Sequence, residues 1–130
     1  MTELYIVDDH RMVLEGLSLL LNGEEDIKVT QTFNSANEVI KALENHVPDI
    51  ILMDINMPEL NGIEATKIIK KAHPEVHIIA LSMISESNLI KLMLKNGANG
   101  YLHKNAGHEE IKNENKQVLS GKKYLSEEIF

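Results

Sequence analysis

The sequence predicts a doubly wound α/β fold, with five parallel strands in one sheet and five helices covering its two faces. Short apolar runs alternate with segments in which apolar residues recur at helical spacing, an alternation typical of βαβ units. Several of the short runs are apolar throughout, as in strands that are buried on both faces. The 130 residues are enough for one such domain and too few for two independent ones.

The first half of the chain predicts two strands, each followed by a helix. The strands cover residues 4–7 and 27–33, and the second alternates apolar with polar residues, which predicts an edge position in the sheet. The first helix is expected to end near Asn22 and Gly23, because glycine readily adopts the left-handed conformation that closes a helix. Ser35 is well placed to cap the second helix.

The second half predicts three further strands, over residues 50–53, 77–82 and 100–103. The first two of these are largely apolar, so we expect them in the centre of the sheet together with strand 4–7. The helix between them must end before Pro74, which cannot continue it. Its inward-facing residues are expected to be Ala65, Ile68, Ile69 and Ala72.

A fourth helix is expected to open in the stretch "SESN" at residues 85–88 and to stop at Asn96 and Gly97. Its inward-facing residues are expected to be Leu89, Leu92 and Met93. A fifth helix is predicted over residues 108–119. The last ten residues, 121–130, contain no complete element and are interpreted as a linker.

The composition narrows the classes of function. The formal net charge of −7 opposes direct binding to nucleic-acid phosphates. The absence of cysteine excludes disulfides and thiolate metal sites. The sequence has neither an apolar run of membrane-spanning length nor the N-terminal pattern of a signal peptide. We therefore expect a cytoplasmic protein that has no membrane partner and does not itself contact DNA.

Polar residues follow four of the predicted strands at the point where each strand ends. Asp8 and Asp9 follow the first strand and Asp54 follows the third. Ser82 closes the fourth strand, and Lys104 follows the fifth. Because the carboxyl ends of parallel strands meet at one edge of the sheet, where such folds bind ligands, we expect these side chains to converge.

Taken singly, these residues have simpler explanations. Asp8 or Asp9 could serve only as a helix cap. Ser82 could be an ordinary loop residue and Lys104 a solvated surface charge. Three converging carboxylates repel one another, however, and a single lysine does not balance them, so their oxygens favour a hard divalent ion such as Mg²⁺. The neighbouring His10 is expected to pack or to cap the helix rather than to bind the metal.

A magnesium site beside a carboxylate, a hydroxyl and an ammonium group suits phosphoryl transfer. In this interpretation Asp54 is the nucleophile and forms an aspartyl phosphate. The hydroxyl of Ser82 donates to one phosphoryl oxygen, and the ammonium group of Lys104 helps to neutralise the others.

Four motifs resemble the receiver domains of bacterial two-component response regulators, which have a flavodoxin-like (CheY-like) fold. The motifs are "VDDH" at 7–10, "DINMPELNG" at 54–62, "LS" at 81–82 and "GANGYLHKNA" at 97–106. The resemblance implies that a sensor histidine kinase phosphorylates Asp54, and that Ser82 and Lys104 grip the phosphoryl oxygens. The Mg²⁺ ligands that it implies are Asp9, Asp54, the main-chain carbonyl of Asn56 and, through water, Asp8.

Two further stretches, "GL" at 16–17 and "VLSGKKYLSEEI" at 118–129, resemble the NarL/FixJ (LuxR-type) subfamily of transcription regulators. In that subfamily a C-terminal helix-turn-helix domain follows the receiver. Residues 1–120 are therefore expected to be the receiver, and 121–130 a linker toward an output domain outside this chain, which implies a truncated protein rather than a stand-alone receiver. The implied partners are the sensor kinase, a second copy after phosphorylation, and DNA through the output domain alone.

Phosphorylation is expected to switch the domain through Ser82 and Tyr101. Ser82 should move toward the phosphoryl group and, by resemblance, Tyr101 should turn inward into the vacated space. The alternative for Tyr101 is a half-buried strand tyrosine with its hydroxyl in water. The chain departs from the commoner receiver pattern in having Ser82 instead of threonine. It also has Asn105 where many receivers carry a cis-proline, and a cis bond without proline costs about 2.5 to 4 kcal/mol.

Other functions have weaker support in the sequence. An aspartate-based phosphatase usually carries a second acid two residues after its nucleophile, where this chain has Asn56. A flavodoxin-like nucleotide-binding protein needs a glycine- and hydroxyl-rich loop after its first strand, where "DDHRM" would repel a phosphate. We therefore expect no enzyme acting on external substrates. A receiver that does not act through DNA, or a protein-interaction module, is the alternative.

Overall fold

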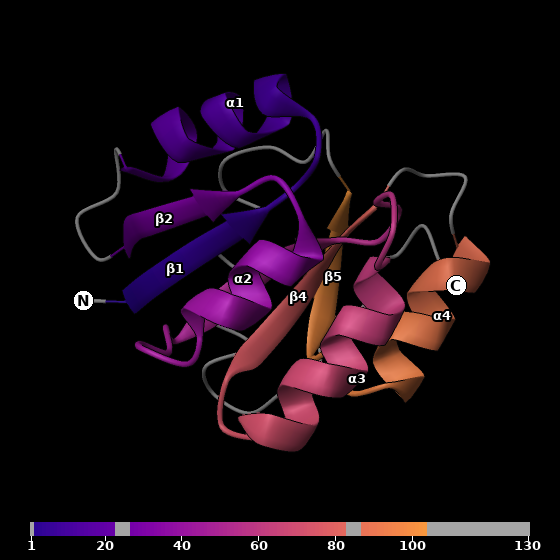
Figure 1. The fold of residues 1–130 in the computed structure, drawn as a ribbon. Coiled ribbons are helices and arrows are strands. Elements are labelled where there is room, and N and C mark those ends of the chain that lie inside the picture. Colours follow the sequence, from indigo (N-terminus) through magenta and orange to yellow (C-terminus); the bar gives the residue numbers. More distant parts are fainter. Residues whose placement is uncertain (1, 23–26, 83–86, 104–130) are drawn as a thin grey trace.

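A five-stranded parallel sheet runs through the computed structural model, which describes residues 2–22, 27–82 and 87–103 (Figure 1). The strands are β1 (Thr2–Val7), β2 (Ile27–Phe33), β3 (Ile50–Asp54), β4 (His77–Ser82) and β5 (Gly100–His103). Their order in the sheet is β2-β1-β3-β4-β5. The three central strands and the edge strand β2 are thus those that the apolar patterns predicted.

Helices cover both faces of this sheet. The described residues include α1 (Arg11–Asn22), α2 (Ala36–Ala42), α3 (Gly62–Ala72) and α4 (Ser87–Lys95). Figure 1 shows α1 on one face and the other three helices on the opposite face, so the doubly wound architecture is confirmed. The fifth helix predicted over 108–119 and the linker predicted over 121–130 lie outside the described residues. No helix within the described ranges is long and apolar enough to cross a membrane.

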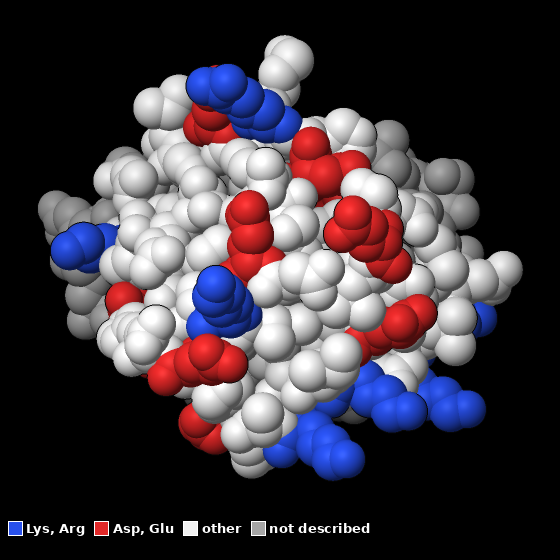
Figure 2. All heavy atoms as spheres, in the orientation of Figure 1, with Lys and Arg blue, Asp and Glu red and all other residues white. Residues whose placement is uncertain are grey.

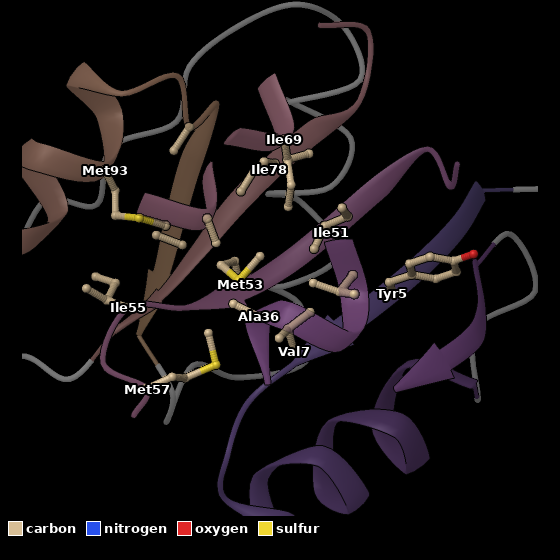
Figure 3. Close-up of a cluster of buried hydrophobic side chains, with 14 of the residues drawn as sticks. Tyr5, Val7, Ala36, Ile51, Met53, Ile55, Met57, Ile69, Ile78 and Met93 are labelled. Atoms are coloured by element: carbon tan, nitrogen blue, oxygen red, sulfur yellow. The ribbon is translucent and has the colours of Figure 1, made fainter. Parts of the chain in front are cut away.

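Successive residues of each strand point to opposite faces and therefore build two separate cores. In β1, Tyr5 and Val7 belong to the core that lies under α2, α3 and α4, part of which is shown in Figure 3. Leu4 and Ile6 belong to the core that α1 covers with Leu17 and Leu21. Burial on both faces explains why the central strands are apolar almost throughout.

The predicted helix boundaries have clear local causes. Ser35 caps α2, because its hydroxyl oxygen accepts a hydrogen bond of 3.3 Å from the backbone N–H of Glu38. Asn61 caps α3 in the same way, with a bond of 3.0 Å from the N–H of Glu64. α4 ends at Lys95, which confirms the predicted stop at Asn96 and Gly97, and Gly97 has a φ of 117°, a conformation that favours glycine.

The inward face of α3 differs from the prediction. Ala65 and Ile69 are buried as expected, but Ile68 is 45% exposed and Ala72 is also exposed. The buried residues of the helix are Gly62, Ala65, Thr66 and Ile69. The helix is rotated toward Gly62 and Thr66 because Gly62 packs on the backbone of β3 and Thr66 contacts Met93 of α4, with an Oγ1–Sδ distance of 3.6 Å.

The inward face of α4 is also shifted by one position. Met93 is buried as predicted, and Leu89 packs partly against the core. Leu92 was predicted inward but is 44% exposed, whereas Ile90 is completely buried. The buried arc of the helix is centred between Ile90 and Met93, so Leu92 lies at its margin.

Candidate functional site

Two aspartates stand side by side at the carboxyl end of the central strands. Asp54 is the last residue of β3, which runs one residue further than predicted, and Asp8 directly follows β1. β1 and β3 are neighbours, with Val7 opposite Met53, so the two aspartates are brought together by the strand register. Asp8 and Asp54 are 0% and 1% exposed, respectively. Two carboxylates are therefore withdrawn from water at the rim where sheets of this type bind ligands.

Asp9 and His10 complete a cluster with these two aspartates. One ligand atom from each of the four residues can be chosen such that all lie within 4.8 Å of one another. The backbone N–H of His10 donates to Oδ1 of Asp8 over 2.8 Å, which holds the turn between β1 and α1. Nδ1 of His10 lies 3.0 Å from Oδ1 of Asp8 and 3.3 Å from Oδ1 of Asp9.

His10 was expected to pack or to cap the first helix, and the structure confirms the second alternative. Its side chain is 64% exposed and lies against the two aspartates instead of in a core. The residue precedes α1, and its carbonyl oxygen accepts the N–H groups of Val13 and Leu14 at the start of that helix. The carbonyl group of His10 thus caps the start of α1, and its imidazole lies within the acidic cluster.

The donor set of the cluster fits a magnesium ion. Asp8, Asp9 and Asp54 contribute carboxylate oxygens, which hard divalent cations prefer, whereas an imidazole nitrogen is a poorer ligand for Mg²⁺. Burial makes the mutual repulsion of Asp8 and Asp54 more costly than it would be in water. A cation bound between them would offset that repulsion.

Ser82 lies at the same rim, on the strand next to Asp54. It is the last residue of β4, and its neighbour Leu81 stands opposite Asp54 in the β3–β4 ladder. The side chain of Ser82 is completely buried, and its hydroxyl is 3.5 Å from the carbonyl oxygen of Leu102, a distance at which a hydrogen bond is weak. The hydroxyl can therefore change partner at little cost.

Three further residues, Asn56, Lys104 and Tyr101, were predicted to belong to the site or to its switch. Asn56 follows β3 in the loop to α3 and is exposed, and the role of its main-chain carbonyl as a metal ligand stays a prediction. Lys104 lies outside the described residues, so its role stays a prediction. Tyr101 is completely buried in β5, which does not fit the alternative of a half-buried tyrosine with a wet hydroxyl.

Gly62 is a site residue for which the sequence predicted no role. Its N–H donates to the carbonyl oxygen of Ile55 over 2.8 Å, which brings the start of α3 against the end of β3. A Cβ atom at this position would lie only 2.1 Å from the backbone oxygen of Asp54. Glycine is therefore required for the helix to approach Asp54, and the pair Asn61–Gly62 at a helix start was the available signal.

The comparisons with known proteins agree with this geometry. A family model described as "Response regulator receiver domain" matches residues 4–116. Response regulator GacA of Pseudomonas viridiflava is 32% identical over 129 residues, which are 99% of this chain and 60% of the relative. Transcriptional regulatory protein DegU of Brevibacillus brevis is 32% identical over 127 residues, which are 98% of this chain and 54% of the relative. The chain thus spans little more than half the length of these relatives.

A solved structure extends the likeness to three dimensions. The crystal structure of a LuxR-family two-component response regulator from Aurantimonas sp. SI85-9A1 matches with a TM-score of 0.91 and 28% identity. The match covers 99% of this chain and 92% of the solved one.

Proposed function

The chain belongs to the response regulator receiver domain family, in its NarL/FixJ-type branch, and we propose that it is a signalling domain in which Asp54 accepts a phosphoryl group. The observation that carries this proposal is the convergence of Asp8, Asp9 and Asp54 within 4.8 Å at the carboxyl end of β1 and β3. Asp54 differs from the other two in being the last residue of a central strand and in lying next to β4, the strand that carries the hydroxyl of Ser82. It is also almost completely buried.

The phosphoryl donor proposed is a phosphohistidine of a sensor kinase. An Oδ atom of Asp54 attacks the phosphorus, a P–O bond forms, and the P–N bond breaks, so that the imidazole leaves with the bonding electrons and takes up a proton. The Ser82 hydroxyl donates to a phosphoryl oxygen, and the ammonium group of Lys104 pairs with the charge that remains. The aspartyl phosphate carries a charge of about −1.5 to −2, where the free carboxylate of Asp54 carries about −1.

The metal proposed for this reaction is Mg²⁺. Its ligands would be Asp9, Asp54 and the main-chain carbonyl of Asn56, with Asp8 acting through water. When bound, the ion neutralises phosphoryl oxygens and reduces their repulsion by the carboxylates. Asp8 then contributes chiefly charge, which its complete burial makes effective over a short distance.

Incubation with acetyl phosphate and Mg²⁺ is expected to add about 80 Da to the chain, the mass of one phosphoryl group replacing a proton. The measurement is the mass of the intact protein, with EDTA in place of Mg²⁺ as the control, and EDTA is expected to prevent the addition. An unchanged mass in the presence of Mg²⁺ would contradict the proposal and favour a protein-interaction module.

Asp8→Asn is expected to lower the Mg²⁺ affinity about tenfold or more, because the site loses one of its negative charges. The amide oxygen still accepts the N–H of His10, so the turn is kept. Without Mg²⁺ this variant should be at least as stable as the wild type, because one buried repulsion is removed. Calorimetric Mg²⁺ titration measures the affinity, and Glu44→Gln, at an exposed acid beyond the C-terminal end of α2, is the control. Equal affinities of all three proteins would exclude Asp8 from the site.

Asn56 bears on whether the domain also acts as an enzyme. It occupies the place where an aspartate-based phosphatase needs its general acid, and an amide cannot protonate a leaving group. We therefore propose that the domain turns over only its own phosphoryl group and has no external substrate.

We further propose that phosphorylation controls transcription through a separate DNA-binding domain. One relative carries the name of a transcriptional regulatory protein. On the face shown in Figure 2 acidic side chains are scattered, and one group of basic side chains lies at the lower edge, over the C-terminal ends of α3 and α4. Lysines in the last turn of a helix complement its dipole, and no broad basic stripe crosses this face. The formal net charge of −7 opposes binding to nucleic-acid phosphates, so we assign DNA contact to another domain. Association of two copies after phosphorylation belongs to the same proposal, and a receiver without DNA output is the alternative.

A further inference from the structure

His103 is a buried titratable side chain next to the proposed site that the mechanism above does not use. It is the last residue of β5, and only 5% of it is exposed. Its imidazole packs edge-on against the ring of Tyr101, with the ring centroids 5.8 Å apart and an interplanar angle of 72°. This is the T-shaped arrangement in which aromatic rings attract each other.

The strand register places His103 next to both residues of the expected switch. Ser82 stands directly opposite His103 in the β4–β5 ladder, and Ala80 stands opposite Tyr101. Since side chains two residues apart in a strand share one face, all four lie on the face that α3 and α4 cover. Alanine and serine are small, so β4 leaves space for the two rings of β5.

We propose that His103 is a positioning residue that stabilises the buried position of Tyr101 through this ring contact. The proposal rests on the proposed function, because the position of Tyr101 matters as the output of Asp54 phosphorylation. A T-shaped pair shifts an equilibrium between two positions of a ring by about two- to tenfold. His103 therefore sets the population of the Tyr101-inward state on which phosphorylation acts.

The same contact gives Ser82 a route to Tyr101. Among the described residues, the Ser82 hydroxyl has a weak hydrogen bond to the carbonyl of Leu102. Ser82 is the cross-strand neighbour of His103, so its movement toward a phosphoryl group would change the surroundings of the imidazole. A shift of the imidazole is passed to Tyr101, because their rings are in contact. His103 thus links Ser82, which would contact the phosphoryl group, to Tyr101, whose position would change in response.

The test uses the full chain in three forms: wild type, His103→Leu and His103→Phe. Leucine keeps an apolar side chain in the buried position but removes the ring, and phenylalanine keeps a ring that can pack edge-on. NMR signals of the tyrosine rings are recorded with Mg²⁺, before and after addition of beryllofluoride, a phosphomimetic. The chain has only three tyrosines and no tryptophan, so the signal of Tyr101 can be assigned with a Tyr101→Phe variant.

Tyr5 provides an internal control in the same spectra. It is also completely buried and packs edge-on against a ring, that of Phe33, with centroids 5.3 Å apart. This pair lies on β1 and β2, away from β5. Its signal should be the same in all three proteins, which also shows that the variants are folded.

In His103→Leu the Tyr101 signal is expected to move toward the value of a solvent-exposed tyrosine, and beryllofluoride should move it back by at least about twice the wild-type change. His103→Phe should behave as the wild type. An unchanged Tyr101 signal in His103→Leu, or a signal in His103→Phe that moves as it does in His103→Leu, would overturn the proposal. If His103→Leu does not fold, His103→Phe tests the proposal by itself. The proposal then requires that the Tyr101 signal of His103→Phe matches that of the wild type. Failure of the proposed function is detected separately, as the absence of an acetyl phosphate adduct in the wild type. In that case the Tyr101 signals of the three proteins can still be compared before beryllofluoride is added.

Discussion

Asp54→Asn is expected to abolish the addition of a phosphoryl group from acetyl phosphate. An amide has almost the shape of the carboxylate but lacks the negatively charged oxygen that attacks phosphorus. Intact-protein mass spectrometry in the presence of Mg²⁺ should therefore show no adduct at times when the wild type is modified. The fold should be kept, because the substitution removes one of the charges that repel one another at the rim.

Asp49→Asn is the matched control for this prediction. Asp49 is an exposed aspartate before β3, at the opposite end of the strand from Asp54, and its Oδ2 accepts the backbone N–H of Glu3 over 2.8 Å. Asparagine can accept the same hydrogen bond, so the control makes the same chemical change without touching the rim. It should be modified as fast as the wild type. An adduct on Asp54→Asn, mapped by peptide sequencing to Asp9 or Ser82, would show that the nucleophile has been assigned to the wrong residue.

Gly62→Ala is expected to lower the free energy of unfolding by about 2 to 4 kcal/mol, because the backbone must move to accept the new methyl group. The added carbon would lie 2.1 Å from the carbonyl oxygen of Asp54 and 3.0 Å from its carbonyl carbon. Both obstacles are backbone atoms, which cannot turn away as the end of a side chain can. The start of α3 must therefore withdraw from β3, at the expense of the hydrogen bond from Gly62 to Ile55.

The same substitution should slow phosphorylation, because Asp54 is the residue that the methyl group would push. A displacement of about 1 Å in a catalytic group can lower a rate by about a hundredfold. Denaturant unfolding and the time course of the acetyl phosphate reaction measure the two effects. Gly16→Ala is the control, since a Cβ on Gly16 in α1 would meet nothing within 4 Å, and it should stabilise the protein by about 0.5 to 1 kcal/mol. Equal stability of the two variants would contradict the close packing of α3 on Asp54.

The position of the acidic cluster could be predicted from the sequence because it depends on topology alone. Once the apolar runs are recognised as parallel strands, the residues that follow them must meet at one edge, and Asp8 and Asp54 do so. The caps at Ser35 and Gly97 could be predicted for a similar reason, since each depends on a few neighbouring residues. Lys104 follows the same logic and stays a prediction.

The contacts between elements could not be predicted in this way. Helical spacing identifies an apolar arc only to within about one residue, so Ile68 and Leu92 were placed inward although their helices turn other residues to the sheet. The exposure of His10 and its approach to two aspartates depend on how tightly the chain turns after β1.

The sequence by itself determined the parallel sheet, its central strands and the edge at which the carboxylates gather. The reason is that the order of apolar and polar residues along the chain indicates which strands are buried on both faces and in which direction they run. Only the tertiary structure decided that Gly62 must lack a side chain and that His103 packs on Tyr101. The first depends on the distance between α3 and the end of β3, and the second on how the two rings of β5 are oriented in the core. Both are set when the helices and the sheet pack together.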